Sequence, residues 1–253
     1  PRARNVSQKS ILCPLPDRDF DLTEVAVPWK LLTEAGHRVV FATELGAEPR
    51  CDPLLIDGVV FGQLGAAEEP IRFYRELETA GSFRVPERWA DLDLARFDAL
   101  LLPGGHAQGM RQYLGSEPLA RQVAALWTSN LPVAAICHGV LVLARAKDPK
   151  SGASVLRDSR TTCLPTYMER LAHALTFWKL GRYYRTYPAT VEQEVRAALA
   201  DPRAQFDRGP INLGRRGTRD DDDGTFVVED GPYVSARWPG DAYTFARALI
   251  ARL

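Results

Sequence analysis

The chain has 253 residues, of which 45% are hydrophobic and 25% are charged, the composition of an ordinary globular protein. Lys plus Arg and Asp plus Glu each number 32, so no net charge favours a nucleic-acid partner or an anionic membrane. No apolar run approaches the roughly 20 residues that span a bilayer, and the basic N-terminus lacks the apolar stretch of a signal peptide. These features predict a cytoplasmic protein that binds neither nucleic acid nor membrane.

The first part of the chain alternates apolar runs with helical periodicity. Residues 9–16 predict a buried strand, and a polar loop follows at 17–21. A helix is expected over 22–35, capped by Asp21 or Thr23 and ended by Gly36, and 37–43 reads as the second strand. Short apolar runs separated by helices of this length indicate βαβ units and a parallel sheet.

The middle of the chain contains two continuous apolar runs of the kind found in strands buried on both faces. The less regular residues 44–97 contain one expected helix at 68–79. Beyond them, the expected elements are a strand from 97 that stops at Pro103, a helix at 116–129, a strand at 131–137 and a helix that begins near His138.

The last part of the chain is more irregular. We expect a turn and short strands over 148–165, helices at 166–180 and 189–200, then two strands, a Pro-Gly turn and a terminal helix. The acidic run 220–223 lacks the alternating ligands and closing Glu of a calcium loop, so it is interpreted as a solvated loop. Without repeats or low-complexity linkers, the chain is predicted to form one domain, 1–253, with insertions at about 44–90 and 175–220.

The strongest chemical signal is the sequence Ala-Ile-Cys-His-Gly at 135–139, where the second central strand meets a helix. A nucleophile at such a strand–turn–helix corner is exposed at the carboxyl edge of the sheet, and the helix dipole favours its thiolate. A free cysteine is more often a small buried hydrophobe, and that interpretation suits Cys13, Cys51 and Cys163. All four cysteines lack CxxC or zinc-like spacing, so we expect free thiols and no metal site.

A second signal is the pair Gly104-Gly105, which ends the first central strand. Backbone amides that carry no neighbouring side chain can approach a developing oxyanion. Two glycines after a strand are by themselves an ordinary turn. Their expected position, at the same sheet edge as Cys137, favours the catalytic interpretation.

These motifs, together with 21–43 and 233–249, resemble the ThiJ/PfpI superfamily over most of the chain. The resemblance implies a flavodoxin-like α/β sandwich with a mainly parallel central sheet, helices on both faces and the class I glutamine amidotransferase-like fold. The Gly-Gly-His sequence at 104–106 is similar to the heat-shock chaperone and glyoxalase III branch. No cofactor or metal is implied, and relatives of this kind imply a homodimer.

The resemblance also assigns site residues. Cys137 matches the nucleophile, and Glu24 matches the protonated glutamate beside its sulfur. The amides of Gly105 and His138 match the oxyanion hole, and the His138 side chain matches the triad histidine. Gly104 and His106 would border the pocket. Glu24 could instead be a solvated charge in the first turn of its helix.

The third triad member is less well defined. Glu169 stands where the branch places an acid, with Asp241 as the alternative, and Glu169 could instead pair with Arg170 or a neighbour. His37 and His173 carry no site prediction. A glutaminase of this fold needs a His-x-Glu pair late in the chain, and none follows His173, so glutaminase activity is not expected.

These residues predict attack of Cys137 on a small electrophilic carbonyl, and the resemblance implies glyoxalase III-type conversion of 2-oxoaldehydes to 2-hydroxy acids without glutathione. Amidase or peptidase-like hydrolysis is the enzymatic alternative. A stress-related chaperone or redox sensor without catalysis is the other class. The aromatic segment 177–195 belongs to none of the motifs. Four interpretations stay open for it: a lid, a dimer surface, an apolar patch or ordinary packing of an inserted helix.

Overall fold

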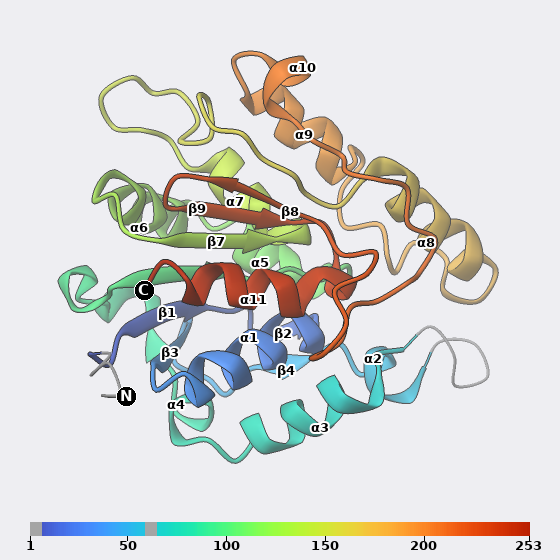
Figure 1. The fold of residues 1–253 in the computed structure, drawn as a ribbon, viewed down its shortest axis with the longest axis horizontal. Coiled ribbons are helices and arrows are strands. Elements are labelled where there is room, and N and C mark those ends of the chain that lie inside the picture. The colour runs from blue at the N-terminus through green and yellow to red at the C-terminus, as the bar shows by residue number, and fades with distance from the viewer. Residues whose placement is uncertain (1–6, 59–64) are drawn as a thin grey trace.

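The computed structural model describes residues 7–58 and 65–253 and is built around one large sheet (Figure 1). Seven strands lie in the order β5-β3-β1-β6-β7-β9-β8, and every neighbouring pair is parallel except β8 with β9. This arrangement confirms the predicted flavodoxin-like sheet. The strands are β1 Ser10–Pro14, β3 Arg38–Thr43, β5 Glu87–Arg88, β6 Ala99–Leu102, β7 Val133–Ile136, β8 Val227–Asp230 and β9 Tyr233–Ala236.

Helices cover both faces of this sheet (Figure 1). On one face α1 packs against α3 and α11, and on the other α7 packs against α5, α6 and α9. The helices are α1 Leu22–Glu34, α2 Leu54–Asp57, α3 Glu68–Leu77, α4 Gly81–Arg84, α5 Arg111–Leu114, α6 Glu117–Thr128, α7 Val140–Arg145, α8 Thr166–Leu180, α9 Val191–Ala198, α10 Pro202–Gln205 and α11 Ala242–Ile250. No described helix is long and apolar enough to cross a membrane.

The central strands β6 and β7 explain where the site forms. All four residues of each strand are buried, as expected for strands covered by helices on both faces. They pair in parallel, with Leu100 opposite Val133 and Leu102 opposite Ala135. Their carboxyl ends therefore lie side by side, and the chain segments that follow them meet at one edge of the sheet.

The structure differs from the sequence prediction in two irregular regions. The segment 17–21 is not only a loop, because Arg18–Phe20 forms a short strand, β2, parallel to β4 (Arg50–Cys51). Residues 148–165 form turns with no regular strand. The Asp148 carboxylate accepts hydrogen bonds from the amides of Lys150 and Ser151, which closes a turn instead of extending the chain.

The predicted insertions supply elements around the sheet. The first contains β4, α2, α3 and α4, with residues 59–64 outside the described part, and the second contains α9 and α10. The exposed carboxylates of Asp221 and Asp223 pair with Arg215, as expected for a solvated loop. All four cysteines are free thiols, as predicted, and all are buried.

Candidate active site

Cys137 occupies the sharp turn that the sequence predicts. It follows β7, begins a 3₁₀ turn over Cys137–Gly139 and has φ of 58°, a left-handed conformation that costs about 1–3 kcal/mol in a residue with a side chain. Gly139 makes this turn possible, because a Cβ there would lie 2.1 Å from the carbonyl oxygen of Leu102. The turn therefore packs directly against the end of β6, and the backbone strain is concentrated at the candidate nucleophile.

The environment of the thiol corrects the sequence prediction, which placed it outside the core as a thiolate. Cys137 is only 1% exposed. Burial raises the pKa of its thiol well above the ordinary value, and Glu24 and Asp21 would act in the same direction in their ionised forms. The helix dipole contributes little, because α7 has six residues and begins only at Val140. Cys137 is therefore a neutral thiol in the free protein.

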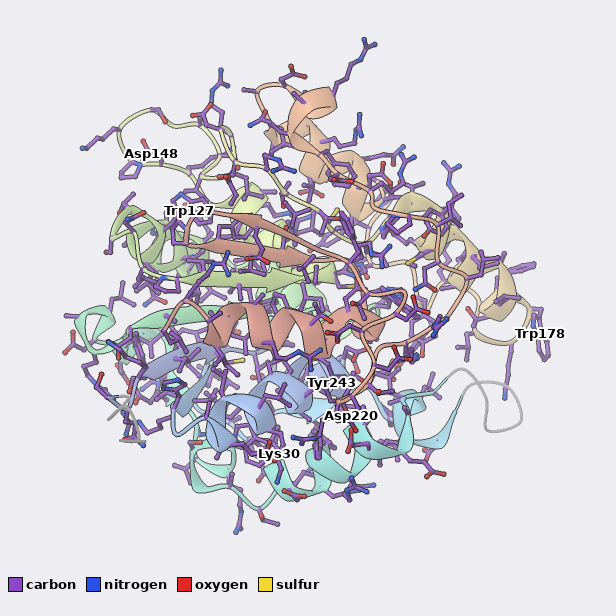
Figure 2. The ribbon with its side chains drawn as sticks, viewed as in Figure 1. Lys30, Trp127, Asp148, Trp178, Asp220 and Tyr243 are labelled. Carbon is purple, nitrogen blue, oxygen red and sulfur yellow. The ribbon has the colours of Figure 1, made fainter. Side chains whose placement is uncertain are left out.

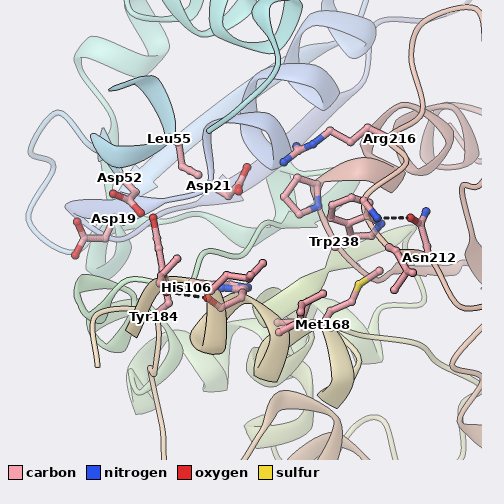
Figure 3. Close-up of a pocket in the computed structure, with 18 residues that line it drawn as sticks. Asp19, Asp21, Asp52, Leu55, His106, Met168, Tyr184, Asn212, Arg216 and Trp238 are labelled. Atoms are coloured by element: carbon pink, nitrogen blue, oxygen red, sulfur yellow. Dashed lines mark hydrogen bonds between the residues drawn. The ribbon is translucent and has the colours of Figure 1, made fainter. Parts of the chain in front are cut away.

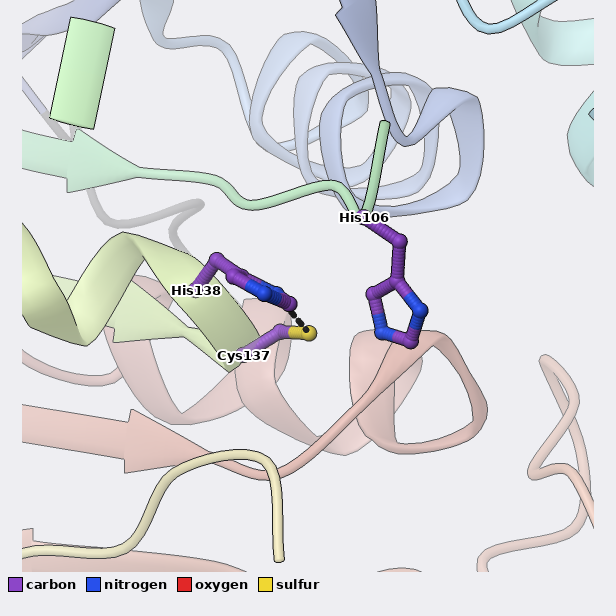
Figure 4. Close-up of side chains that lie close together, drawn as sticks. All are labelled: His106, Cys137 and His138. Carbon is purple, nitrogen blue, oxygen red and sulfur yellow. Dashed lines mark hydrogen bonds between the residues drawn. The ribbon is translucent and has the colours of Figure 1, made fainter. Parts of the chain in front are cut away.

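His138 is oriented as a base toward this thiol. Its Nδ1 lies 3.5 Å from Sγ of Cys137, and its Nε2 lies 3.4 Å from Oγ1 of Thr186 (Figure 4). The Thr186 hydroxyl donates its single proton to the carbonyl oxygen of His106, at 2.6 Å. Oγ1 can therefore only accept from His138, which requires the proton on Nε2 and leaves the Nδ1 lone pair facing the sulfur.

Burial also fixes the charge of the imidazoles. It lowers the pKa of His138 well below the ordinary value, with His106 and Arg145 acting in the same direction. It lowers the pKa of His106 to about 4. Both rings are neutral at physiological pH, and their centroids lie 4.8 Å apart in an edge-to-face arrangement. A neutral His138 can accept a proton from Cys137 when substrate arrives.

Glu24 is not a solvated charge of the first helical turn, because it is completely buried. Its Oε2 accepts a hydrogen bond of 2.7 Å from the amide of Gly104, whereas Oε1 has no hydrogen-bond partner among the described residues. Burial raises its pKa well above the ordinary value, with the charge of Asp21 as the next cause, and Cys137 is among the neighbouring groups that affect it. These effects favour the protonated form of Glu24 beside the thiol.

The glycine pair after β6 lies against the turn at Cys137, as the sequence argument requires. A Cβ on Gly104 would lie 2.7 Å from the amide nitrogen of His138, and one on Gly105 would lie 2.7 Å from the carbonyl oxygen of Asp19. A larger residue at either position would displace the backbone. Because Glu24 accepts from the Gly104 amide, the Gly105 and His138 amides are the candidates for oxyanion donors.

The two predicted third members of the triad lie elsewhere in the structure. The Glu169 carboxylate accepts from the amide of Val191 at the start of α9, at 2.9 Å. Asp241 forms a completely buried ion pair with Arg237, at 2.9 Å. Neither acid is hydrogen-bonded to His138. The position next to Nε2 is occupied by Thr186, a neutral hydroxyl, so among the residues that the structure describes no acid is hydrogen-bonded to the histidine of the Cys-His pair.

A cavity of about 240 Å³ lies beside this cluster (Figure 3). His106 lines it, whereas Cys137 does not, and the donor atom of His106 lies within 4.8 Å of the sulfur. The remaining wall combines acidic, basic and aromatic groups with an apolar face from α8. These groups are Asp19, Asp21, Asp52, Tyr184, Arg216 and Trp238 on the polar side, and Met168, Leu171, Ala172 and Leu175 on the apolar side.

The charged groups on the polar side of the cavity affect one another's pKa values. Burial raises the pKa of Asp21 to about 6, with the Arg216 charge opposing and the Asp52 charge reinforcing the shift. Burial also raises the pKa of Asp52, which accepts from the Tyr183 hydroxyl at 3.0 Å. The guanidinium of Arg216 lies over the Trp238 ring, 5.2 Å from its centroid, and extends toward Asp21 (Figure 3). The cavity can hold a polar molecule with an apolar portion.

The sequence did not identify several of these residues. Thr186 and Tyr184 belong to the segment 177–195, whose aromatic composition was the only signal that it had a role. The Tyr184 ring packs edge-on against His106, with centroids 5.8 Å apart. Arg216 lies in the second predicted insertion and has no motif of its own. The fold brings these segments to the end of β6.

Comparison with known proteins places this chain in a family. Residues 15–210 match the model described as ThiJ/PfpI family-like. An uncharacterised protein of Schizosaccharomyces pombe is 28% identical over 180 residues, 68% of this chain and 65% of that protein, so the chain spans just under two thirds of that relative. A Pyrococcus abyssi protein named as a deglycase is 24% identical, with 92% of this chain and 93% of that protein covered.

Among solved structures, glyoxalase III from Candida albicans has the same fold. Its TM-score is 0.70 at 18% identity, and the match covers 97% of both chains. At this identity the match shows a shared fold, and it does so over nearly the whole length of both chains.

Proposed function

The chain belongs to the ThiJ/PfpI family, and we propose that it is a cysteine-dependent enzyme that converts small 2-oxoaldehydes to 2-hydroxy acids without glutathione. The observation that carries this proposal is the contact between Sγ of Cys137 and the unprotonated Nδ1 of His138, 3.5 Å apart at the carboxyl edge of the sheet. The likeness in fold to a glyoxalase III supports the reaction type.

The first step forms a bond between sulfur and the aldehyde carbon. The thiol proton passes to Nδ1 of His138 as Sγ attacks, and the developing oxyanion receives hydrogen bonds from the amides of Gly105 and His138. The protonated imidazole then returns its proton to the oxyanion. This gives a neutral hemithioacetal, and the site needs no preformed thiolate.

The second step moves hydrogen within the substrate. Removal of the proton from C1 and delivery of a proton to C2 convert the hemithioacetal and its neighbouring ketone into a thioester and an alcohol. Glu24 or His138 carries these protons. Water then cleaves the thioester, which restores the thiol and releases the 2-hydroxy acid. The overall change is addition of one water, with C1 oxidised and C2 reduced, so no external oxidant or reductant is required.

Turnover of a 2-oxoaldehyde in D₂O tests this mechanism. We expect a 2-hydroxy acid that carries deuterium at C2, loss of activity in Cys137→Ala and activity close to wild type in Cys163→Ala, which changes another buried free thiol. An active Cys137→Ala variant would falsify the nucleophile assignment. Activity limited to aldehyde adducts of amines would instead favour deglycation, the reaction for which the P. abyssi relative is named.

A chaperone function is the second candidate, and exposed apolar side chains on α8 favour it. Phe177 and Trp178 are 60% and 63% exposed, and Trp178 projects from the end of the helix (Figure 2). Suppression of aggregation of an unfolded client should persist in Cys137→Ala and fall in Phe177→Ser/Trp178→Ser. Light scattering of the same proteins gives their molar masses. It shows whether the expected homodimer forms and whether the Phe177→Ser/Trp178→Ser change disrupts it.

A further inference from the structure

Three side chains at the turn after β7 present metal-ligating atoms to one another. They are the thiol of Cys137 and the imidazoles of His106 and His138, and their donor atoms all lie within 4.8 Å of one another. Figure 4 shows Sγ of Cys137 pointing into the space between the two rings. The spacing of these residues in the sequence does not indicate a metal site, because His106 follows β6 whereas Cys137 and His138 follow β7.

The separation between Sγ of Cys137 and Nδ1 of His138 fits a tetrahedral site. With Zn–S of about 2.3 Å and Zn–N of about 2.0–2.1 Å, two ligands on one tetrahedral ion lie about 3.5 Å apart for sulfur and nitrogen. Sγ of Cys137 and Nδ1 of His138 are 3.5 Å apart without any movement. The other two separations are at most 4.8 Å, so they would have to shorten by no more than about 1.5 Å.

The surroundings prepare His138 as a ligand. Histidine ligands usually donate their second ring N–H to an oxygen, which fixes the tautomer and the ring orientation. Here Nε2 donates to Oγ1 of Thr186, which leaves Nδ1 with a free lone pair that an ion can occupy. Thr186 in turn donates to the carbonyl oxygen of His106, so one hydroxyl links both imidazole residues.

We propose that Cys137, His138 and His106 form a binding site for one Zn²⁺ ion, with a fourth position open toward the cavity. One thiolate and two imidazoles are the ligand set that zinc and related borderline-soft ions favour over Mg²⁺ or Ca²⁺. His106 lines the cavity, so the fourth ligand is water or a small molecule that enters there. Binding forms a Zn–S bond, and the thiol proton leaves to solvent.

A zinc ion in this site would block the proposed reaction and would not take part in it. The Zn–S bond uses the sulfur lone pair that attacks the carbonyl, and the ion occupies the Nδ1 lone pair that accepts the thiol proton. Zinc is therefore an inhibitor. The binding proposal does not depend on the reaction, because it concerns the affinity of the cluster for a metal.

Co²⁺ is a spectroscopic probe for this site. The full chain, treated with a chelator and freed of any affinity tag, is titrated with Co²⁺ under anaerobic conditions. We expect one equivalent to produce intense tetrahedral d–d bands and a near-ultraviolet thiolate-to-cobalt band, both abolished by one equivalent of Zn²⁺. Oxygen-only sites, such as the acidic loop 220–223, give no thiolate band.

Variants separate the three ligands from other groups. Cys137→Ser should abolish the thiolate band, and His106→Ala and His138→Ala should weaken Co²⁺ binding at least about tenfold. Cys163→Ser and His173→Ala should bind as wild type. If Cys137→Ser proves unfolded by circular dichroism, wild-type protein alkylated at Cys137 replaces it. A thiolate band that survives either change, or unchanged affinity in folded His106→Ala, overturns the proposal.

Discussion

The hydroxyl of Thr186 is the group that holds His138 in its base form, and Thr186→Val removes it while preserving the branched shape. Nε2–H of His138 then loses its acceptor at 3.4 Å, and the carbonyl of His106 loses its donor at 2.6 Å. Leaving a buried polar group unsatisfied costs about 1–3 kcal/mol. Moving the ring proton to Nδ1 relieves part of that cost, but it removes the lone pair that receives the thiol proton.

This cost should appear in the chemical step. At about 1.4 kcal/mol for each factor of ten, 1–3 kcal/mol corresponds to a decrease in kcat of roughly 5- to 150-fold. Thr186 does not line the cavity, so KM should change less than about threefold. Thr186→Ser keeps the hydroxyl and should retain kcat within about threefold.

Two assays measure this effect. Steady-state turnover of a 2-oxoaldehyde gives kcat and KM. The rate of iodoacetamide alkylation, read at Cys137 by mass spectrometry, reports the activation of the thiol without any assumption about substrate. Both rates should fall in Thr186→Val and recover in Thr186→Ser. If Thr186→Val is folded and both rates stay within twofold of wild type, His138 does not act as the base in the tautomer inferred here.

Three further predictions concern stability. Gly139→Ala places a Cβ 2.1 Å from the Leu102 carbonyl oxygen and should lower the free energy of unfolding in urea by about 3 kcal/mol or more, whereas Gly81→Ala, in open space, should be nearly neutral. Asp241→Asn leaves Arg237 charged and buried and should cost about 3–5 kcal/mol. A double Asp241→Leu/Arg237→Met variant should restore only part of this loss, because the Phe226 amide and the Pro210 carbonyl then lose their partners, and a double variant no more stable than Asp241→Asn would contradict the ion-pair argument. The raised pKa of Asp21, about 6, means that the folded protein holds this proton more tightly than the unfolded chain does. Wild-type stability should therefore fall by about 2 kcal/mol relative to Asp21→Asn as pH rises from 4 to 7, and a constant difference would refute the shift.

The sequence predicted the parts of the site that depend on local pattern. Apolar runs located β6 and β7, and the residues that end them, Gly105 and Cys137, were placed at one sheet edge because parallel neighbours end together. The left-handed turn at Cys137 also follows from its immediate neighbours, since Gly139 permits the close packing on β6.

The sequence failed where the environment depends on distant segments. Thr186 reaches His138 from an irregular stretch 48 residues away, so no motif spacing could indicate the contact. Glu169 stands in a position that the family pattern favours, yet its carboxylate accepts a hydrogen bond from the Val191 amide at the start of α9. The burial of Cys137 could not be predicted either, because neighbours such as His106, whose donor atom lies within 4.8 Å of the sulfur, follow a different strand.

The burial of Cys137 separates catalysis from redox sensing. A sensor thiol must be accessible and ionised before it meets an oxidant, whereas this thiol is 1% exposed and burial raises its pKa. A catalytic thiol has a different requirement, because it needs to lose its proton only when an electrophile is in place. The Nδ1 lone pair of His138 at 3.5 Å meets that requirement, since charge forms on sulfur and imidazole only as the carbonyl oxygen accepts the electrons. Because the free protein holds no preformed thiolate, the form that peroxide oxidises, the arrangement favours an enzyme that reacts with carbonyls over a sensor of oxidants.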